Sequence, residues 1–376
     1  MRDGMRRGGR LGAVMAVLLL CGCTLSNSLR QDDFYSVWRQ GPATRTMFFA
    51  TDREPAGGGF GLHWNAALRC GRAAIAIPVI WSSAPLPLAG NEACDTDAAL
   101  AAFARQVAAT AHDAGCGRVL VFVHGYNTTF RTAMAQAAQL SLDTQWRCAM
   151  LAFSWSSEAK FDRYAADIER SGFAVPALIG LVRELKAAGL EVDLLTHSMG
   201  GRVTLSALGA LCAEPRTVVN DLLLVAADVG AEQGNDDFGH LLRRTAPCVR
   251  HVTVYASDND MALIASESVH GGVPRAGRVP GRDRQYAGTQ VDIVNASLAP
   301  GDSTGHGYLT LSYEMAEDVM WTLADTDAAR RVQIGTLACA DGCADARYVL
   351  KVAPERHPDG FSRLIRQVWP LIFPVQ

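Results

Sequence analysis

Short apolar runs alternate with helix-like segments along most of this chain. The runs are rich in Val, Leu and Ile, and they occur at Arg118–Val123, Ala149–Phe153, Val192–Leu195, Leu222–Ala226, Val252–Tyr255 and Val291–Val294. Apolar residues recur with helical spacing in Asp95–Ala114, Thr128–Leu142, Gly201–Cys212 and Leu309–Leu323, and in Ala165–Ala188 with an interruption near Pro176. Such alternation, with strands apolar throughout, is typical of a parallel sheet covered by helices on both faces. The predicted fold class is therefore α/β, with a mainly parallel central sheet.

The composition suits a packed protein and gives little sign of a charged partner. Of the 376 residues, 49% are hydrophobic and 19% are charged, which is enough apolar material for a large core. The net charge is −3, and a nucleic-acid-binding domain usually carries a basic excess, so no nucleic-acid partner is predicted. The sequence contains neither a Cys-x-x-Cys pair nor a His cluster with zinc spacing, so no metal and no cofactor is predicted.

The N-terminus has the features of an export signal. Arginines precede the apolar run Leu11–Leu20, which is too short to span a membrane comfortably. The following Leu20-Cys21-Gly22-Cys23 resembles a bacterial lipoprotein cleavage site. This resemblance implies that residues 1–22 are removed, that Cys23 is acylated, and that residues 23–44 form a tether. The expected location is the bacterial cell envelope, membrane-anchored on the periplasmic side. An ordinary signal peptide or an uncleaved anchor is the alternative.

The cysteine count is compatible with export. Of ten cysteines, eight remain beyond Cys21 and Cys23, and an even number in an exported protein is typical of disulfides. Cys339 and Cys343 are close enough in sequence for a disulfide between them to close one local loop. The sequence also makes plausible the pairs Cys70 with Cys94 and Cys212 with Cys248, and it leaves Cys116 and Cys148 unassigned.

One serine follows a predicted strand and precedes a predicted helix. It is Ser198, in the segment Thr196-His197-Ser198-Met199-Gly200. A sharp strand-to-helix turn lifts a nucleophilic serine out of a sheet, and small neighbours allow the turn to close. Thr196 stands where this pattern usually has glycine, which weakens the motif. The alternative is a serine that only caps the helix.

A second turn, His124-Gly125-Tyr126-Asn127, follows the strand that ends at Val123. A His-Gly turn in this place can supply one backbone N–H group of an oxyanion hole, and the residue after the nucleophile supplies the other. The predicted donors are therefore Gly125 or Tyr126, together with Met199. His124 precedes the nucleophile in the chain, which favours a structural role for it.

A catalytic histidine is expected late in the chain, after an acid. His306 lies in Gly305-His306-Gly307-Tyr308, between the last predicted strand and a helix, and is the predicted base. His270 is its main rival, and His251 begins a strand, which favours a buried or edge role.

The acid is expected in a loop after a late strand, where it can orient the imidazole. Asp260 is preferred, with Asp258 second. Asp228 follows the preceding strand and is a further alternative, although it could equally cap a loop or helix.

Taken in order, these segments resemble a known bacterial family. They are VFVHGYNTTF at Val121–Phe130, THSMGGRV at Thr196–Val203, YASDNDMAL at Tyr255–Leu263, and the His270-Gly271-Gly272 and Gly305–Tyr308 segments. The family is an esterase-like group of α/β-hydrolases of unknown function that carries a His-Gly-Tyr-Asn motif. The resemblance covers residues 45–325 and leaves 326–376 as a C-terminal extension. It implies an α/β-hydrolase fold and a triad of Ser198, Asp260 and His306, but no substrate.

The sequence thus predicts a serine hydrolase that cleaves a carboxylic ester through an acyl-enzyme, acting on a small-molecule or lipid ester. A peptidase or acyltransferase on the same triad is one alternative, and a non-catalytic envelope lipoprotein that uses the fold as a binding scaffold is another. Residues 156–176 are aromatic-rich and are interpreted as a lid over the site or as an insertion packed on the sheet.

Overall fold

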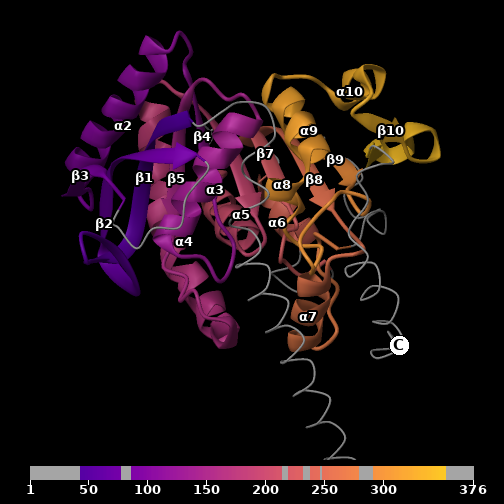
Figure 1. Ribbon diagram of the computed structural model, residues 1–376, viewed down its shortest axis with the longest axis horizontal. Helices are drawn as coiled ribbons and strands as arrows, with labels where there is room; N and C mark the ends of the chain where they lie inside the picture. The colour runs from indigo at the N-terminus through magenta and orange to yellow at the C-terminus, as the bar shows by residue number, and fades with distance from the viewer. Residues whose placement is uncertain are drawn as a thin grey trace, which may run out of the picture.

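The structure is a computed structural model that describes residues 43–77, 86–213, 219–231, 238–245, 248–278 and 291–352. The predicted signal peptide, Cys23 and the tether up to residue 42 lie outside the described residues. A single sheet of 11 strands runs through the molecule in the order β10-β11-β9-β8-β7-β6-β4-β5-β1-β2-β3 (Figure 1).

Parallel strands form the centre of this sheet, as predicted. They are β5 (Ala149–Ser154), β4 (Arg118–Val123), β6 (Glu191–His197), β7 (Val219–Val225), β8 (Val249–Ala256) and β9 (Val291–Asn295). A long antiparallel hairpin of β1 (Ala43–Ala56) and β2 (Gly59–Ile77) flanks them, followed by β3 (Leu88–Ala93). Because β1 pairs with β5 in parallel, the hairpin extends the same sheet. The predicted α/β class with a mainly parallel sheet is confirmed.

Helices cover both faces of the sheet (Figure 1). One apolar layer includes side chains of α2 (Asp97–Asp113), α4 (Tyr164–Ala187), α5 (Gly200–Leu211) and α6 (Phe238–Thr245). The other includes side chains of α3 (Phe130–Asp143), α7 (Met261–Val269), α8 (Tyr308–Leu311), α9 (Tyr313–Leu323) and α10 (Ala328–Ile334). Burial on both faces explains why the central strands are apolar along their whole length.

Helix α4 runs through Pro176 without the predicted interruption. Proline removes one backbone hydrogen bond and crowds the preceding turn, which normally kinks a helix. Here Ala174 and Leu178 are fully buried in the core on either side of the proline, so packing holds the helix together. The segment interpreted as a lid or packed insertion is therefore largely the first half of α4, and its Tyr164 and Asp167 bond to residues of the loops that follow β7, β4 and β5.

The predicted C-terminal extension is described as far as residue 352, and this part continues the sheet. After α10, β10 (Leu337–Cys339) pairs with β11 (Arg347–Leu350), and β11 lies parallel to β9. Leu337 and Leu350 are buried in the same apolar layer as α9.

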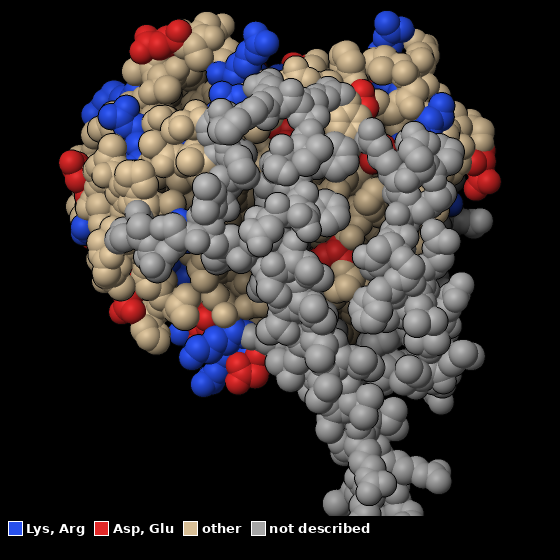
Figure 2. Space-filling model, viewed as in Figure 1, with Lys and Arg blue, Asp and Glu red and all other residues tan. Residues whose placement is uncertain are grey.

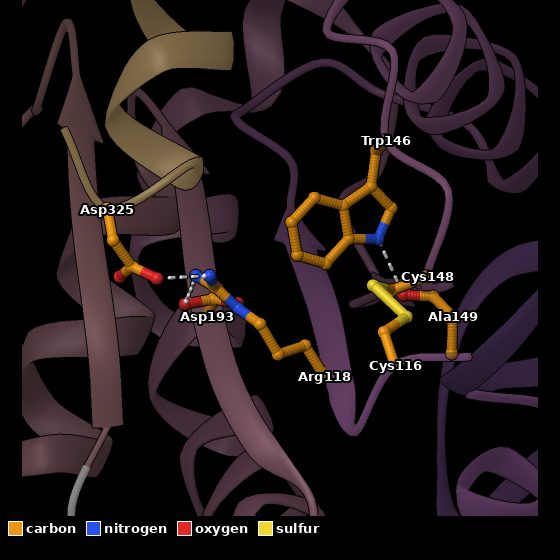
Figure 3. The surroundings of a disulfide bond; sticks show 7 residues. All are labelled: Cys116, Arg118, Trp146, Cys148, Ala149, Asp193 and Asp325. Atoms are coloured by element: carbon orange, nitrogen blue, oxygen red, sulfur yellow. Dashed lines mark hydrogen bonds and ion pairs between the residues drawn. A yellow bond between two sulfur atoms is a disulfide. The ribbon is translucent and has the colours of Figure 1, made fainter. Parts of the chain in front are cut away.

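Disulfides join Cys70 to Cys94, Cys212 to Cys248 and Cys339 to Cys343, which confirms the three pairs that the sequence made plausible. A further disulfide joins Cys116 to Cys148, with their Cα atoms 5.9 Å apart (Figure 3). These two residues directly precede β4 and β5, so the parallel pairing of those strands brings them together.

Charged side chains form a network at the amino ends of the parallel strands. The guanidinium of Arg118 contacts the carboxylates of Asp193 and Asp325 and lies over the ring of Trp146 (Figure 3). It also contacts the carboxylate of Asp221. His251 continues the network, since its Nδ1 is 3.5 Å from Asp221 and its Nε2 is 3.0 Å from Asp292. Hydrogen bonds to these two carboxylates raise the pKa of His251 to about 9. His251 is partly exposed and β8 lies between β9 and β7, so it is neither buried nor at a sheet edge, contrary to the prediction, and its contacts are those of this network.

On the face shown in Figure 2, acidic and basic side chains are interspersed over the described residues, without an extended patch of one sign. Among the described residues, no helix is both long enough and apolar enough to cross a membrane.

The raised pKa of His251 predicts a pH-dependent contribution to stability. Because the folded state favours the charged imidazole, this contribution is complete below the unfolded pKa of 6.5 and is lost as the pH rises through about 9. We expect His251→Gln to lower the free energy of unfolding by about 1–2 kcal/mol at pH 6, and by much less at pH 10. Urea unfolding with the disulfides intact measures this, with the exposed His63→Gln as control. An equal loss at both pH values would contradict the prediction.

Candidate active site

Ser198 occupies a strained turn between β6 and α5. Its φ is 55°, in the left-handed region that residues with a side chain rarely adopt. The Ser198 N–H group donates to the Val225 carbonyl at the end of β7, 2.9 Å away, which fixes the turn against the neighbouring strand. The side chain is only 5% exposed. A serine held in this conformation at the carboxyl end of a central strand is what a nucleophile turn requires.

Two glycines allow the backbone to close around Ser198. A Cβ atom on Gly200 would lie 2.4 Å from the Val123 carbonyl oxygen, and one on Gly125 would lie 2.8 Å from Cβ of Ser198. Neither distance can hold a carbon atom, so both positions require glycine. The turn after β4 is therefore pressed directly against the nucleophile turn after β6.

Thr196 replaces the usual glycine without opening this turn. It is fully buried, and its hydroxyl makes no hydrogen bond with any part of the structure. Its side chain lies beside Gly201, where an added Cβ would be 3.6 Å from the threonine Oγ1, an ordinary van der Waals distance.

Two of the predicted oxyanion donors, Gly125 and Met199, adjoin Ser198. Gly125 lies against it, as described above, and Met199 directly precedes the first turn of α5. Tyr126 packs its ring edge-on against Tyr164 of α4, with the ring centroids 5.2 Å apart. The structure thus brings the three predicted donors to one end of the sheet.

His124 has the structural role expected for it. Its ring is fully buried and stacks on Trp155, and its nitrogens lie 2.7 Å from the Gly125 carbonyl and 3.1 Å from the Trp155 carbonyl. Burial lowers the pKa of His124 to about 3, so the ring is neutral at physiological pH.

His306 and Asp260 are brought together. The imidazole Nδ1 of His306 is 2.6 Å from Oδ2 of the fully buried Asp260. Asp260 also caps α7, because its Oδ1 accepts from the Leu263 N–H group at 2.9 Å. Burial acts to lower the pKa of His306, but the Asp260 carboxylate outweighs it, so the pKa is raised.

The loop that carries His306 lies over the nucleophile turn. The ring of His197, the residue before Ser198, is 4.6 Å from the His306 ring, and its Nε2 is 3.1 Å from the His306 carbonyl oxygen. Asp302 fixes this loop, since its Oδ1 accepts from the His306 N–H group at 3.1 Å. The predicted base therefore contacts the residue that directly precedes the predicted nucleophile.

The two alternative acids, Asp258 and Asp228, have other hydrogen-bond partners than His306. Asp258 has an exposed side chain, and its N–H group donates to Ser297. Asp228 is close to the site, because its N–H group donates to the Ser198 carbonyl at 3.2 Å. Its carboxylate, however, accepts from the hydroxyls of Tyr164, at 2.5 Å, and Ser266, at 2.6 Å. The rival base His270 has its Nδ1 2.8 Å from the Ser266 carbonyl, away from Asp260.

Sequence reasoning missed Arg275, and it included Tyr164 only as one of the aromatic residues of the predicted lid or packed insertion. Tyr164 joins Tyr126 to Asp228, and Arg275 lies 3.6 Å from the Asp228 carboxylate. Neither belongs to a recognisable motif, and only the folded chain brings them to the site.

A cavity of about 480 Å³ lies away from these residues. It is at the amino ends of β1 and β5, and its lining includes Arg45, Phe48 and Trp146. In the part of the chain that the structure describes, no group of His, Cys, Asp and Glu side chains is arranged to hold a metal ion.

Residues 98–319 match the family described as "Alpha/beta hydrolase of unknown function (DUF900)". The chain belongs to this family. No curated protein matches the sequence.

Solved structures similar to this α/β hydrolase include esterases at low identity. One of two fungal esterases from Rhizomucor miehei is 16% identical, with a TM-score of 0.34 over 57% of this chain and 76% of that one. ESTFA in its iron-lacking apo form is 9% identical, with a TM-score of 0.38 over 83% and 91%. A mutant of LAE6, an alpha/beta hydrolase from the metagenome of Lake Arreo, Spain, is 12% identical, with a TM-score of 0.33 over 99% and 92%.

The close approach at Gly200 predicts a strong effect of a single methyl group. In Gly200→Ala the added carbon meets backbone oxygens rather than a movable side chain, so we expect the free energy of unfolding to fall by about 1–3 kcal/mol. Urea unfolding measures this. Gly172→Ala is the matched control, because an added Cβ there meets nothing within 4 Å. Equal stability of the two variants would contradict the prediction.

Proposed function

We propose that this α/β hydrolase is a serine hydrolase that cleaves a carboxylic ester through an acyl-enzyme. Ser198 is the nucleophile, His306 the general base and Asp260 the residue that orients the base. The observation that carries the proposal is the 2.6 Å contact between His306 and the buried Asp260, in a loop that lies against the Ser198 turn.

The contact assigns a role to each nitrogen of His306. Asp260 accepts the proton on Nδ1, so Nε2 is left with the lone pair that can take a proton from the Ser198 hydroxyl. The serine oxygen then attacks the ester carbonyl, and the imidazolium gives its proton to the departing alcohol. Water repeats the sequence on the acyl-enzyme, which releases the carboxylic acid and restores Ser198. The Asp260 carboxylate, which raises the pKa of His306, stabilises the imidazolium that forms when the neutral ring takes the proton.

Negative charge on the carbonyl oxygen needs hydrogen-bond donors that are already in place. The backbone N–H groups of Met199 and of the Gly125–Tyr126 turn are the proposed donors. The N-terminus of α5 begins beside Ser198 and adds the favourable end of its dipole. Because the glycines lock both turns together, little reorganisation is needed as the charge develops.

The proposed substrate is a small-molecule or lipid ester. A serine–histidine pair also cleaves amides, or transfers the acyl group to an acceptor other than water, so a peptidase or an acyltransferase is the result to expect if esters are poor substrates. No cofactor takes part in the proposed reaction.

Labelling with a fluorescent fluorophosphonate tests the proposal, because this probe phosphonylates an activated serine. We expect folded wild-type protein to be labelled on Ser198 and the Ser198→Ala variant to lose the label, together with at least about 10³-fold in ester hydrolysis. Ser268→Ala is the control, since Ser268 is exposed on α7 and bonds only within its own helix. Folded wild-type protein that neither reacts nor hydrolyses an ester panel would support the binding-scaffold alternative.

We also propose that the protein is an envelope lipoprotein, anchored on the periplasmic side of a membrane through acylated Cys23. The Leu-Cys-Gly-Cys segment supports this, and so do the disulfides, which persist in oxidising compartments. Expression with radioactive palmitate in a bacterial host provides the test. We expect wild-type protein in the membrane fraction to carry the label and Cys23→Ala to lose it, whereas labelled Cys23→Ala would contradict the proposal.

A further inference from the structure

Arg275 is held at the edge of the proposed active site by backbone pairing. Its segment folds back onto the residues that follow β7, with an antiparallel bridge between Arg275 and Gly230. The N–H groups of Ala276 and Gly277 donate to the carbonyls of Val229 and Ala227, both at 2.9 Å. Because Asp228 lies in this same stretch and its N–H group donates to the Ser198 carbonyl, Arg275 is fixed one short segment away from the nucleophile turn.

The Arg275 side chain is buried but incompletely paired. The residue is 3% exposed, and its Nε and Nη2 atoms make no hydrogen bond with any part of the structure. Its Nε lies 3.6 Å from Oδ1 of Asp228, which is an ion pair but too long for a hydrogen bond. A guanidinium does not lose its proton in a protein, and each buried donor left unpaired carries a cost in free energy. Such a cost at an active site points to a ligand that supplies the missing acceptor.

Asp228 does not satisfy the guanidinium because its carboxylate, bonded to two hydroxyls, lies too far from Arg275 for a hydrogen bond. Its Oδ2 accepts from the Tyr164 hydroxyl and its Oδ1 from the Ser266 hydroxyl. The carboxylate therefore balances the charge of Arg275 while leaving N–H donors open. Tyr164 connects this cluster to the oxyanion turn, because its ring also packs against Tyr126.

We propose that Arg275 recognises a carboxylate on the acyl part of the ester. The planar guanidinium matches the two oxygens of a carboxylate better than any other common acceptor apart from phosphate. We place the carboxylate on the acyl part because that part takes part in both steps: the first step bonds it to Ser198, and the second releases it. The inference rests on the proposed function and names its substrate class, monoesters of dicarboxylic acids.

Two esters test this substrate class on the full-length protein. They differ in one charge and in the methyl group that removes it. They are the mono-4-nitrophenyl ester of glutaric acid and the same molecule with its free carboxylate capped as a methyl ester. We expect wild type to favour the charged ester by at least about tenfold in kcat/KM, since a hydrogen bond to a charged group is worth about 1.5–3 kcal/mol. In Arg275→Met we expect this preference to disappear, mainly because KM for the charged ester rises. The kcat/KM for the capped ester should change little.

Matched variants separate recognition from structure. Arg278→Met removes a nearby arginine that pairs with Glu267, and it should keep the preference for the charged ester. Arg275→Lys should keep part of it, because the charge remains without the planar fork. Equal losses on both esters in Arg275→Met would show a merely structural role and overturn the inference.

Wild type decides the question even if Arg275→Met does not fold. Hydrolysis of both esters without preference overturns the inference and leaves the proposed serine hydrolase intact. Failure to hydrolyse either ester, together with no fluorophosphonate labelling of Ser198, overturns the proposed function itself.

Discussion

The structure depends on how closely three chain segments approach at the carboxyl ends of β4, β6 and β7. Positions 125 and 200 require glycine, because no side-chain carbon fits between the turn after β4 and the turn after β6. Val225 at the end of β7 accepts the N–H group of Ser198 and holds that serine in its left-handed conformation. The parallel order of the strands brings these ends together, so the sheet and the site follow from one arrangement.

Two buried carboxylates near Ser198 have different surroundings and, we propose, different roles. Asp260 is bonded to an imidazole and to the first turn of α7, which suits orientation of a base. Asp228 is bonded to two hydroxyls and balances Arg275, which suits a substrate pocket. Both follow parallel strands, and only their partners from distant parts of the chain distinguish them.

Local patterns predicted the central strands and the fold class, because each depends on short runs of sequence. They also named His306 and Asp260, which the structure brings into contact. The preference for Asp260 over Asp258 matches the contact with His306, although both stand in one loop. Features that depend on distant contacts were missed. Cys116 and Cys148 meet only because β4 and β5 are neighbours, and Arg275 reaches Asp228 only because its loop folds back. Packing on both sides of Pro176 likewise overrode a local signal.

A double-mutant cycle tests most directly whether His306 and Asp260 act as one catalytic unit. Ester hydrolysis is measured for His306→Ala, Asp260→Asn and the double variant. If Asp260 acts through the imidazole, Asp260→Asn loses several orders of magnitude in kcat, and the double variant is no slower than His306→Ala within about twofold. Losses that multiply, or an Asp260→Asn variant with nearly full activity, would contradict the proposed triad.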